Sequence, residues 1–488
     1  MHSPVGFLFP ELLSNIFSLC LPPEPYIYPN PDCAPWVLCM VCSHWRSVAI
    51  STPSLWCSIS THSLLHMEKA SDLVRIWLSR VGALPLSIYF TDDGSRRSHH
   101  LFELILSHSS FWRKVEYNLT PVALRQLREI QRGAIPRLES FTLISPWTNS
   151  VASNESFDIF QGAPRLRSVR LLLEVDPLVF KLPFAQLTNF HANYITSVAG
   201  WLKLFQEFLV LSSCMCYIYD TSNMSLPLRT ARLPSLHSLQ ISATQPLGSF
   251  FEHLILPALS ELIIEDEGSN HFAWPQEEFM SFLSAARSAS SLRSLRIINT
   301  TISANNVIEC LQQCPFLIEL SLHDNQWNNH GAVTDQLLAL LTYRPKIGSG
   351  ELGCLCPRLQ GISFIGGNYR DDSIISLVNS RWIHGPVSKG DISHAPLQVS
   401  ARTVVQARRD SHLTYPMGII QAINKSDMFS LSVSDSDAKP VTWLRSLHVE
   451  LKRSLTPDTV GRLTQLEKEG LFVSLPSENK LRNDNSYI

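Results

Sequence analysis

One phrase, of the form Pro-x-Leu-x-x-Leu-x-Leu with other apolar residues substituting, recurs along most of the chain. Clear copies are PRLESFTL from Pro136, PRLRSVRL from Pro164, PSLHSLQI from Pro234, PALSELII from Pro257, PFLIELSL from Pro315 and PRLQGISF from Pro357. Two more, SLRSLRI from Ser291 and WLRSLHV from Trp443, lack only the proline. A recurring phrase of this length is typical of solenoid proteins, so it constrains the fold more than any other feature.

Each copy is expected to form one short strand. Its last two apolar residues are two apart and so share a face, and the apolar residue three positions earlier turns into the same core from the entering bend. The leading proline can neither donate a ladder hydrogen bond nor sit inside a helix, so it marks the end of the preceding helix. Weaker copies fill the gaps: LSIYF with Ile88 and Phe90, RKVEYNL with Val115 and Tyr117, PFAQLTNF with Leu187 and Phe190, and CMCYIY with Tyr217 and Tyr219.

The copies recur at spacings that fall mostly in the twenties, close to the leucine-rich-repeat period of roughly 20 to 29 residues. The first strand residue of each copy is assigned as Ile88, Val115, Phe141, Val169, Leu187, Tyr217, Leu239, Leu262, Leu295 and Leu320.

Segments between the strands carry apolar residues three and four apart, which predicts helices. One strand and one helix cannot bury their apolar faces alone, whereas stacked units share a continuous core. We therefore predict an α/β repeat fold: a leucine-rich-repeat-like solenoid over residues 64–384, with concave parallel strands and convex helices. The helical residues are Ala70, Leu73, Val74, Trp77, Leu78 and Val81, then Leu101, Ile105, His108 and Trp112, and later Phe279, Phe282, Leu283 and Ala286.

Two stretches interrupt the rhythm. Residues 325–347 contain the helix-like cluster Leu337, Leu338, Leu340 and Leu341, which indicates a lengthened repeat. Residues 385–440 show no sustained period of 2 or 3.6, and structureless loops longer than roughly 15 residues are uncommon in compact domains. We expect a disordered insertion there, followed by a terminal repeat over residues 441–476.

Charge and composition narrow the class of protein. The chain of 488 residues has 40 Lys and Arg against 42 Asp and Glu, a net charge of -2, which argues against a general nucleic-acid partner. An apolar content of 45% is ample for a continuous core. The longest apolar stretch, residues 208–219, falls short of the roughly 20 residues of a membrane span, and the N-terminus lacks the basic start of a signal peptide. Eleven scattered cysteines suit a reducing compartment, so we expect the protein in the cytoplasm or the nucleus, with no membrane partner.

The first sixty residues differ from the repeats. Helical spacing relates the apolar residues of the segment LFPELLSNIF, a Pro- and Tyr-rich loop follows, and a second helix is expected from Pro35. This predicts a small helical bundle over residues 5–60, with more apolar residues than it can bury internally, so another polypeptide should cover the excess. The apolar face of the second helix is Trp36, Val37, Met40, Val41, Trp45, Val48 and Ala49.

The segments LFPELLSNIF and VCSHWRSVAISTPSLW resemble the F-box pattern L-P-x-E-[IL]-L-x-x-I-F … V-C-[RK]-x-W-[RK]-x-[LIV]-A … P-x-L-W. A Pro-rich loop between the two halves, followed by irregular leucine-rich repeats, is typical of the large F-box families of mushroom-forming fungi. Phe9 replaces the first proline of the pattern, and Ser43 stands where a basic residue is usual. The matching residues are Leu8, Pro10, Glu11, Leu12, Leu13, Ile16, Phe17, Val41, Cys42, Trp45, Arg46, Ala49, Pro53, Leu55 and Trp56.

The resemblance implies a non-catalytic substrate receptor of an SCF-type ubiquitin ligase. The F-box would dock on a Skp-type adaptor of the cullin core, and the repeats would hold a target protein near the ubiquitin-loaded enzyme. Two alternatives stay open: the same apolar residues form the core of the bundle itself, or the chain is a repeat scaffold whose degenerate F-box no longer engages a ligase. The residues that the resemblance assigns to adaptor binding are Leu8, Pro10, Leu12, Leu13, Ile16, Phe17, Val41, Cys42 and Trp45.

Residues that alternate with the buried strand positions should face the concave surface, which in solenoids often binds partners. They are Thr142, Arg170, Gln240, Ile263, Arg296, Ser321, Ser363 and His448, flanked by Glu265, Ile298 and His323. From this set we take as target-binding residues Arg170, Gln240, Ile263, Arg296, Ser321 and His323.

Patterns that would indicate catalysis or a cofactor are weak. Cys39 and Cys42 form a C-x-x-C pair near Cys33, Cys57 and His62, but no second pair follows, and buried cysteines behave as small hydrophobes. Phosphate-binding glycine loops, a nucleophile elbow and a zinc-binding H-E-x-x-H helix are missing from the sequence. We expect no metal, no cofactor and no enzymatic activity, and keep a metal-dependent enzyme built around Cys39 and Cys42 as a third hypothesis.

Overall fold

A computed structural model of the chain describes residues 8–475 with several gaps. The gaps are residue 24 and the ranges 65–66, 146–155, 174–176, 194–196, 220–227, 269–271, 286–290, 325–330, 344–353, 383–443 and 451–454. The predicted insertion over residues 385–440 and the predicted helical residue Ala286 therefore lie outside the described residues.

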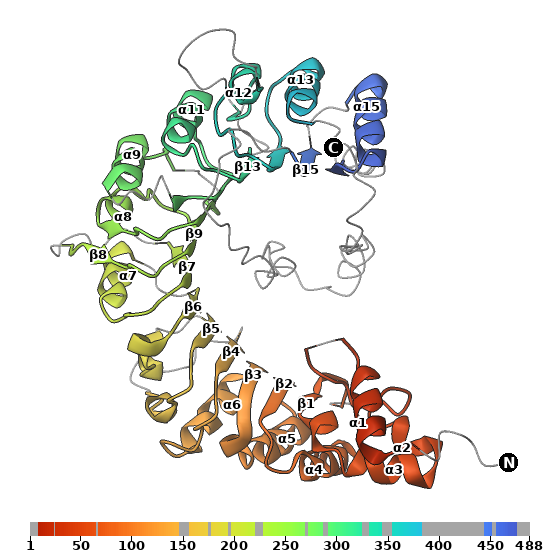
Figure 1. Ribbon diagram of the computed structural model, residues 1–488. Coiled ribbons are helices and arrows are strands. Elements are labelled where there is room, and N and C mark those ends of the chain that lie inside the picture. The colour runs from red at the N-terminus through yellow and green to blue at the C-terminus, as the bar shows by residue number, and fades with distance from the viewer. Residues whose placement is uncertain are drawn as a thin grey trace, which may run out of the picture.

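Within those residues, fourteen strands form one all-parallel sheet in which successive strands along the chain are neighbours (Figure 1). These strands are β1 (Ser58–Ser60), β2 (Leu86–Thr91), β3 (Trp112–Asn118), β4 (Ser140–Ser145), β5 (Ser168–Leu173), β6 (Asn189–Ala192), β7 (Ser213–Ile218), β9 (Ser238–Ala243), β11 (Glu261–Asp266), β12 (Ser294–Ile298), β13 (Glu319–His323), β14 (Gly361–Ile365), β15 (Ser446–Glu450) and β16 (Phe472–Ser474). A separate two-stranded sheet pairs β8 (Ala231–Arg232) with β10 (Leu254–Ile255).

Helices connect the strands and lie on the outer side of the curved sheet, while the strands line the inside of the arc (Figure 1). The predicted fold, a leucine-rich-repeat-like solenoid of α/β units, is confirmed. The α-helices are α1 (Pro10–Leu19), α2 (Leu38–Val41), α3 (Ser43–Ile50), α4 (Ala70–Val81), α5 (Arg96–Leu106), α6 (Pro121–Gln126), α7 (Val198–Phe205), α8 (Gly248–Glu252), α9 (Gln276–Ala285), α11 (Ala304–Gln313), α12 (Asp335–Leu341), α13 (Asp371–Arg381) and α15 (Pro457–Lys468). Short 3-10 helices are η2 (Pro53–Trp56), η3 (His62–Leu64), η4 (Ser109–Phe111), η5 (Leu127–Glu129), η7 (Ile159–Gly162), η8 (Pro177–Phe180) and η9 (Phe184–Gln186).

On each strand, alternate side chains point into the core between the sheet and the helices. These core-facing residues of neighbouring strands stack in rows along the sheet. Leu239, Leu262, Leu295 and Leu320 are register partners, and all four side chains are buried. Leu259, three residues before Leu262, is buried as well, as predicted for the residue that enters from the bend. One apolar core therefore runs from the N-terminal helices to the last repeat.

The predicted register is wrong for two weak copies of the phrase. β7 points Cys214 and Cys216 into the core, so Tyr217, the predicted core residue, faces the opposite side of the sheet. Buried cysteine packs as a small hydrophobe and so occupies the positions that the tyrosines were expected to fill. In β6 the first inward strand residue is Phe190, and Leu187 is the residue that enters from the bend. With both corrections, the repeats from Ile88 to Leu262 keep a spacing in the twenties throughout.

Two predicted helices end differently. α5 stops at Leu106, and Trp112, expected on that helix, begins β3, with its ring buried. The helix expected from Pro35 is divided into α2 and α3, because Cys42 has extended backbone angles and its side chain accepts a hydrogen bond from the backbone nitrogen of Trp45. Helix α4 covers the predicted residues 70–81, and α12 lies in the lengthened repeat as expected.

The solenoid continues directly across the predicted insertion. β15 pairs in register with β14, with Gly361 opposite Ser446, and α15 and β16 complete a terminal repeat. Leu444 donates a backbone hydrogen bond of 3.0 Å to the carbonyl of Arg381. Arg381 is fully buried and anchors this junction by donating to the carbonyls of Leu341 at 2.7 Å and Leu355 at 2.8 Å.

We predict that replacing residues 385–440 by a short glycine–serine linker leaves the solenoid folded, because the chain leaves and re-enters the repeat at one point, beside Arg381. The midpoint of thermal unfolding, followed by circular dichroism, should change by less than about 3 °C, which corresponds to about 3 kcal/mol or less in a chain of this size. A fall of about 10 °C or more would show that this segment packs on the solenoid.

Candidate interaction surfaces

Helix α1 buries one apolar face and exposes another. Leu13 and Phe17 are fully buried, and they are four residues apart, so they form one face of the helix. A second apolar stripe runs along the helix at spacings of three and four, and its side chains are 42% to 87% exposed. This stripe, called the α1 stripe below, consists of Phe9, Leu12, Ile16 and Leu19.

The end of α2 exposes two further apolar side chains of the module, Met40 and Val41, each 57% exposed. The next helix, α3, is held against α1 by Trp45, whose ring centroid lies 4.9 Å from that of Phe17. Exposed apolar side chains of this density are unusual on a monomer and are typical of a surface that another polypeptide covers.

The residues predicted to bind an adaptor fall into two groups. Leu12, Ile16 and Val41 are exposed, whereas Leu13 and Phe17 lie in the core. Pro10 and Cys42 are also exposed, and Leu8 and Trp45 are half-buried against the core. The hypothesis that these apolar residues form the core of the bundle therefore holds for Leu13 and Phe17, but it does not account for the α1 stripe.

Three tryptophans join the helical module to the first repeat. The indole nitrogen of Trp77, on α4, donates to the carbonyl of Trp56 at 2.8 Å, and that of Trp56 donates to the carbonyl of Ala49 at 2.9 Å. The rings of Trp36 and Trp56 lie at 5.4 Å in an edge-on contact, and the guanidinium of Arg80 covers both of them. The α1 stripe is therefore part of a unit that shares its core with the sheet. The sequence pattern did not reveal this connection, because it depends on residues from separate elements.

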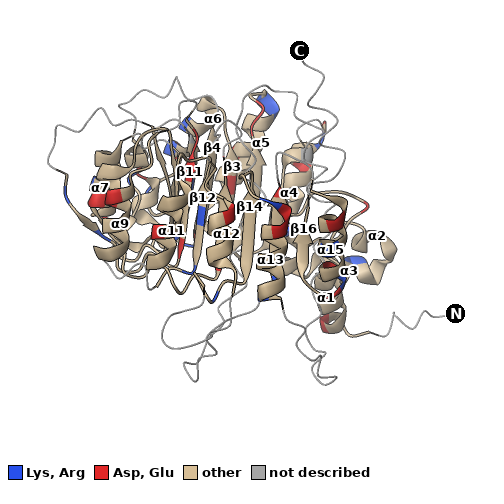
Figure 2. Cartoon of the chain, turned by 90° about the horizontal axis from the view of Figure 1, so that it is seen from above, with Lys and Arg blue, Asp and Glu red and all other residues tan. Residues whose placement is uncertain are grey.

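On the concave face, the predicted target-binding residues lie in rows that cross the sheet. Gln240, Ile263, Arg296 and Ser321 are successive register partners on β9, β11, β12 and β13. Arg170 lies further along the same row, and His323 belongs to the next row, two residues on. Figure 2 shows acidic and basic positions on the neighbouring strands β11 and β12.

An aromatic stack on the concave face was missed by the sequence analysis. His191 stacks on Tyr217 with ring centroids 6.0 Å apart, and Tyr217 stacks on Tyr219 at 5.9 Å. Burial lowers the pKa of His191 to about 3, with Arg170 adding to the effect, so its ring is neutral at physiological pH. Burial raises the pKa of Tyr217 to about 12 and that of Tyr219 further. The outward direction of both tyrosines would have followed from the correct register of β7.

Two carboxylates lie close to this stack. Burial, reinforced by the neighbouring charge of Glu267, raises the pKa of Glu265 to about 7, although Arg296 opposes the shift. Burial also raises the pKa of Glu267, and the hydroxyl of Tyr219 donates a hydrogen bond to its carboxylate. Oxygen Oε2 of Glu265 is buried and has no hydrogen-bond partner among the described residues.

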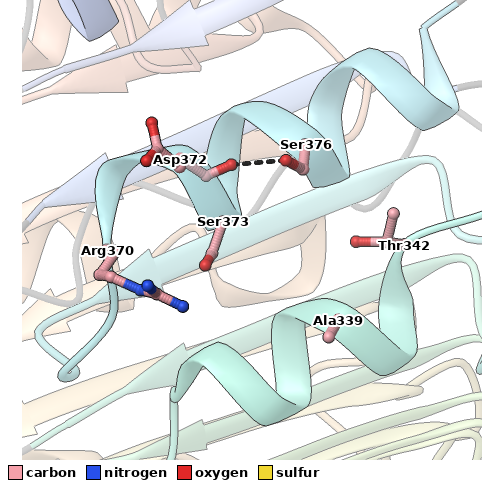
Figure 3. Close-up of a pocket in the computed structure, with 6 residues that line it drawn as sticks. All are labelled: Ala339, Thr342, Arg370, Asp372, Ser373 and Ser376. Carbon is pink, nitrogen blue, oxygen red and sulfur yellow. Dashed lines mark hydrogen bonds between the residues drawn. The ribbon is translucent and has the colours of Figure 1, made fainter.

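A hollow of about 280 Å³ lies on the outer side, between α12 and α13 (Figure 3). Its lining is mostly polar, and its cation, Arg370, is paired with Asp335 at 3.3 Å. The hydroxyls of Thr342, Ser373 and Ser376 also bond locally, as where the Ser376 hydroxyl donates to the Asp372 carbonyl at 2.7 Å. Its cation and its hydroxyls are therefore already engaged within the protein.

Among the described residues, no three His, Cys, Asp or Glu side chains come together in a way that could hold a metal ion. Cys39 is buried, and this burial raises its pKa, whereas Cys42 is exposed. Among the described helices, none has the length and hydropathy needed to cross a membrane. No protein-family model and no curated protein matches the chain.

We predict opposite effects for acidic substitutions on the two faces of α1. Leu13→Asp should lower the free energy of unfolding by more than about 3 kcal/mol, because it removes buried apolar contacts and buries a charge. Leu12→Asp and Ile16→Asp should change it by less than about 1 kcal/mol, as is usual at exposed positions. Urea unfolding followed by tryptophan fluorescence measures both effects. Similar losses for all three variants would mean that the α1 stripe is covered within the folded chain.

The raised pKa of Glu265 predicts that this residue destabilises the fold as pH rises. Between about pH 4.5 and 7 the folded protein holds a proton on Glu265 that the unfolded chain has released, so the contribution of this group to stability falls across that window. The variant Glu265→Gln should therefore gain stability relative to the wild type as pH rises, by about 1–2 kcal/mol after allowance for solvent screening of a partly exposed group. Paired urea titrations at pH 5 and pH 8 provide the measurement. A difference independent of pH would contradict the prediction.

Proposed function

We propose that this chain is the substrate-recognition subunit of an SCF-type ubiquitin ligase. In this role the N-terminal module binds a Skp-type adaptor of the cullin core, and the concave face of the repeats holds a target protein. The observation that carries the proposal is the α1 stripe: an apolar surface left uncovered in the same segment that resembles an F-box.

The exposed residues suit the docking of another protein. Leu12, Ile16 and Val41 match the F-box pattern and are 50%, 42% and 57% exposed. Covering each of them would contribute about 1–2 kcal/mol, because roughly half of each side chain is still in contact with water. Leu19 extends the exposed apolar surface of α1, and Met40 extends that of the end of α2.

The proposed role is positional rather than catalytic. The tryptophan cluster fixes the module to the first repeat, so an adaptor bound at α1 and a target bound on the sheet would be held at a constant separation. Such a connection raises the effective concentration of a target lysine at the ubiquitin-loaded enzyme. The proposal places the protein in the cytoplasm or the nucleus, where this machinery operates.

A repeat scaffold without ligase activity is the second candidate. Two departures from the F-box pattern favour it: Phe9, which is 71% exposed in place of a proline, and Ser43, which is exposed at the start of α3 in place of a basic residue. In that case the α1 stripe would bind a different partner, and the chain would assemble proteins without marking them.

Binding to a purified Skp-type adaptor distinguishes the two candidates. We predict that the full chain binds the adaptor with a dissociation constant in the micromolar range or tighter, and that Leu12→Asp/Ile16→Asp weakens binding at least 30-fold, about 2 kcal/mol. The measurement is isothermal titration calorimetry. Leu13→Asp is unsuitable, because Leu13 is buried and its loss would unfold the module.

A matched control is Val122→Asp/Val460→Asp, which places the same charges at exposed apolar residues of α6 and α15. This control should bind the adaptor as the wild type does. Absence of binding by the folded wild type, or equal binding by the α1 variant, would reject the ligase proposal in favour of the scaffold.

A further inference from the structure

Two tyrosines and two glutamates meet near the middle of the concave face. In register, Tyr217 on β7 is opposite Ser242 on β9, which is opposite Glu265 on β11. Tyr217 and Glu265 are therefore two strands apart, at about 10 Å, with the small Ser242 side chain between them. Tyr219 and Glu267 each lie two residues further on and are joined by the hydrogen bond described above.

Several polar atoms of this region are buried but lack hydrogen-bond partners among the described residues. They are Oε2 of Glu265, Nε2 of His191 and Nε of Arg170. Folded proteins rarely leave such atoms unsatisfied, because each costs about 1–3 kcal/mol. A ligand that donates a hydrogen bond to Glu265 would remove part of this cost.

The charges around the cluster favour a cationic ligand. Glu265 and Glu267 lie side by side, and their mutual repulsion adds to the effect of burial on Glu265. Arg296, on β12, is the neighbouring cation on one side, while Arg170, on β5, lies beyond His191 and Tyr217 on the other. Tyrosine faces attract a cation through the ring quadrupole, and a carboxylate pairs with a guanidinium through two parallel hydrogen bonds.

We propose that Tyr217, Tyr219, Glu265 and Glu267 form a binding site for an arginine side chain of an extended, basic segment of the target protein. The proposal rests on the proposed role of the concave face as the target-binding surface. Arginine suits the site better than lysine, because its planar guanidinium can stack on a tyrosine ring while it pairs with a carboxylate. Ile263 and Ile298, beside Glu265 on the sheet, provide apolar contacts for the rest of the segment.

A cation at this site requires Glu265 to be ionised, so binding should tighten as pH rises from 6 to 8. The groups that face Glu265 are Tyr217 on β7, Glu267, which directly follows β11, and Arg296 on β12. Tyr219, just after β7, faces Glu267. The tyrosines stay protonated over this range, because burial raises their pKa values. His323, on β13, stays neutral, because burial lowers its pKa to about 4.

The test uses the full chain and a fluorescein-labelled nonapeptide that alternates arginine with glycine, with fluorescence anisotropy as the measurement. We expect saturable binding at pH 8 that weakens at least threefold at pH 6. The double variant Glu265→Gln/Glu267→Gln should weaken binding at pH 8 at least tenfold while keeping the melting temperature of the wild type or a higher one. The matched control Glu252→Gln/Glu277→Gln removes the same charge from exposed positions of α8 and α9 and should bind as the wild type does.

The outcomes separate this proposal from the ligase proposal. No saturable binding by the wild type, equal binding by the folded Glu265→Gln/Glu267→Gln variant, or equal binding of a peptide with glutamate in place of arginine would each overturn the arginine site. The variant Leu12→Asp/Ile16→Asp should bind the peptide normally, since the α1 stripe lies on the N-terminal module. Loss of adaptor binding with retained peptide binding would reject the ligase role alone.

Discussion

No single repeat of this chain can bury its own apolar residues, and the rest of the structure depends on that constraint. Each strand contributes two or three inward side chains, and these are removed from water only because register partners such as Leu262 and Leu295 stack on either side. Each repeat packs mainly against the repeats next to it, so every added repeat extends both the sheet and its core. The two ends of the array are therefore the places where apolar surface has to be covered by something other than a repeat.

The N-terminal end is covered by the helical module and its Pro-rich loop. Backbone nitrogen of Ser60, on the first strand, donates to the carbonyl of Ile27 at 2.8 Å, and Tyr26 packs its ring against Tyr89 at 5.7 Å. The loop thus satisfies the edge of the sheet while the tryptophan cluster fills the core beneath it. This arrangement has a consequence for function, because residues used to close the solenoid, such as Leu13 and Phe17, are not free to bind a partner. The α1 stripe is the apolar surface of the same helix that stays exposed when its other apolar face closes the end of the core.

Sequence periodicity predicted the solenoid, the direction of most strand residues and the helices α1, α4 and α12, because these depend on local spacing and on a core shared by similar units. It failed where two residue types competed for one position. Cysteines and tyrosines both alternate along residues 214–219, and the tyrosines were predicted to be buried, so the predicted first core residue, Tyr217, lies three residues after the observed one, Cys214. The division of α2 from α3 at Cys42 and the exposure of Leu12 beside the buried Leu13 depend on tertiary packing, and a helical pattern alone cannot distinguish them.

The corrected register of β7 changes what the concave face can recognise. With Tyr217 and Tyr219 inside the core, the face would present isolated polar groups and two isoleucines; with both rings outside, it presents an aromatic stack that ends at two carboxylates of raised pKa. On a sheet face that is simply solvated, a carboxylate oxygen would lie in water, where it is hydrogen-bonded at no cost. Oε2 of Glu265 is instead buried without a hydrogen-bond partner among the described residues. The free-energy cost of burying this oxygen is therefore the feature of the concave face that most favours ligand recognition over a purely structural role for Glu265.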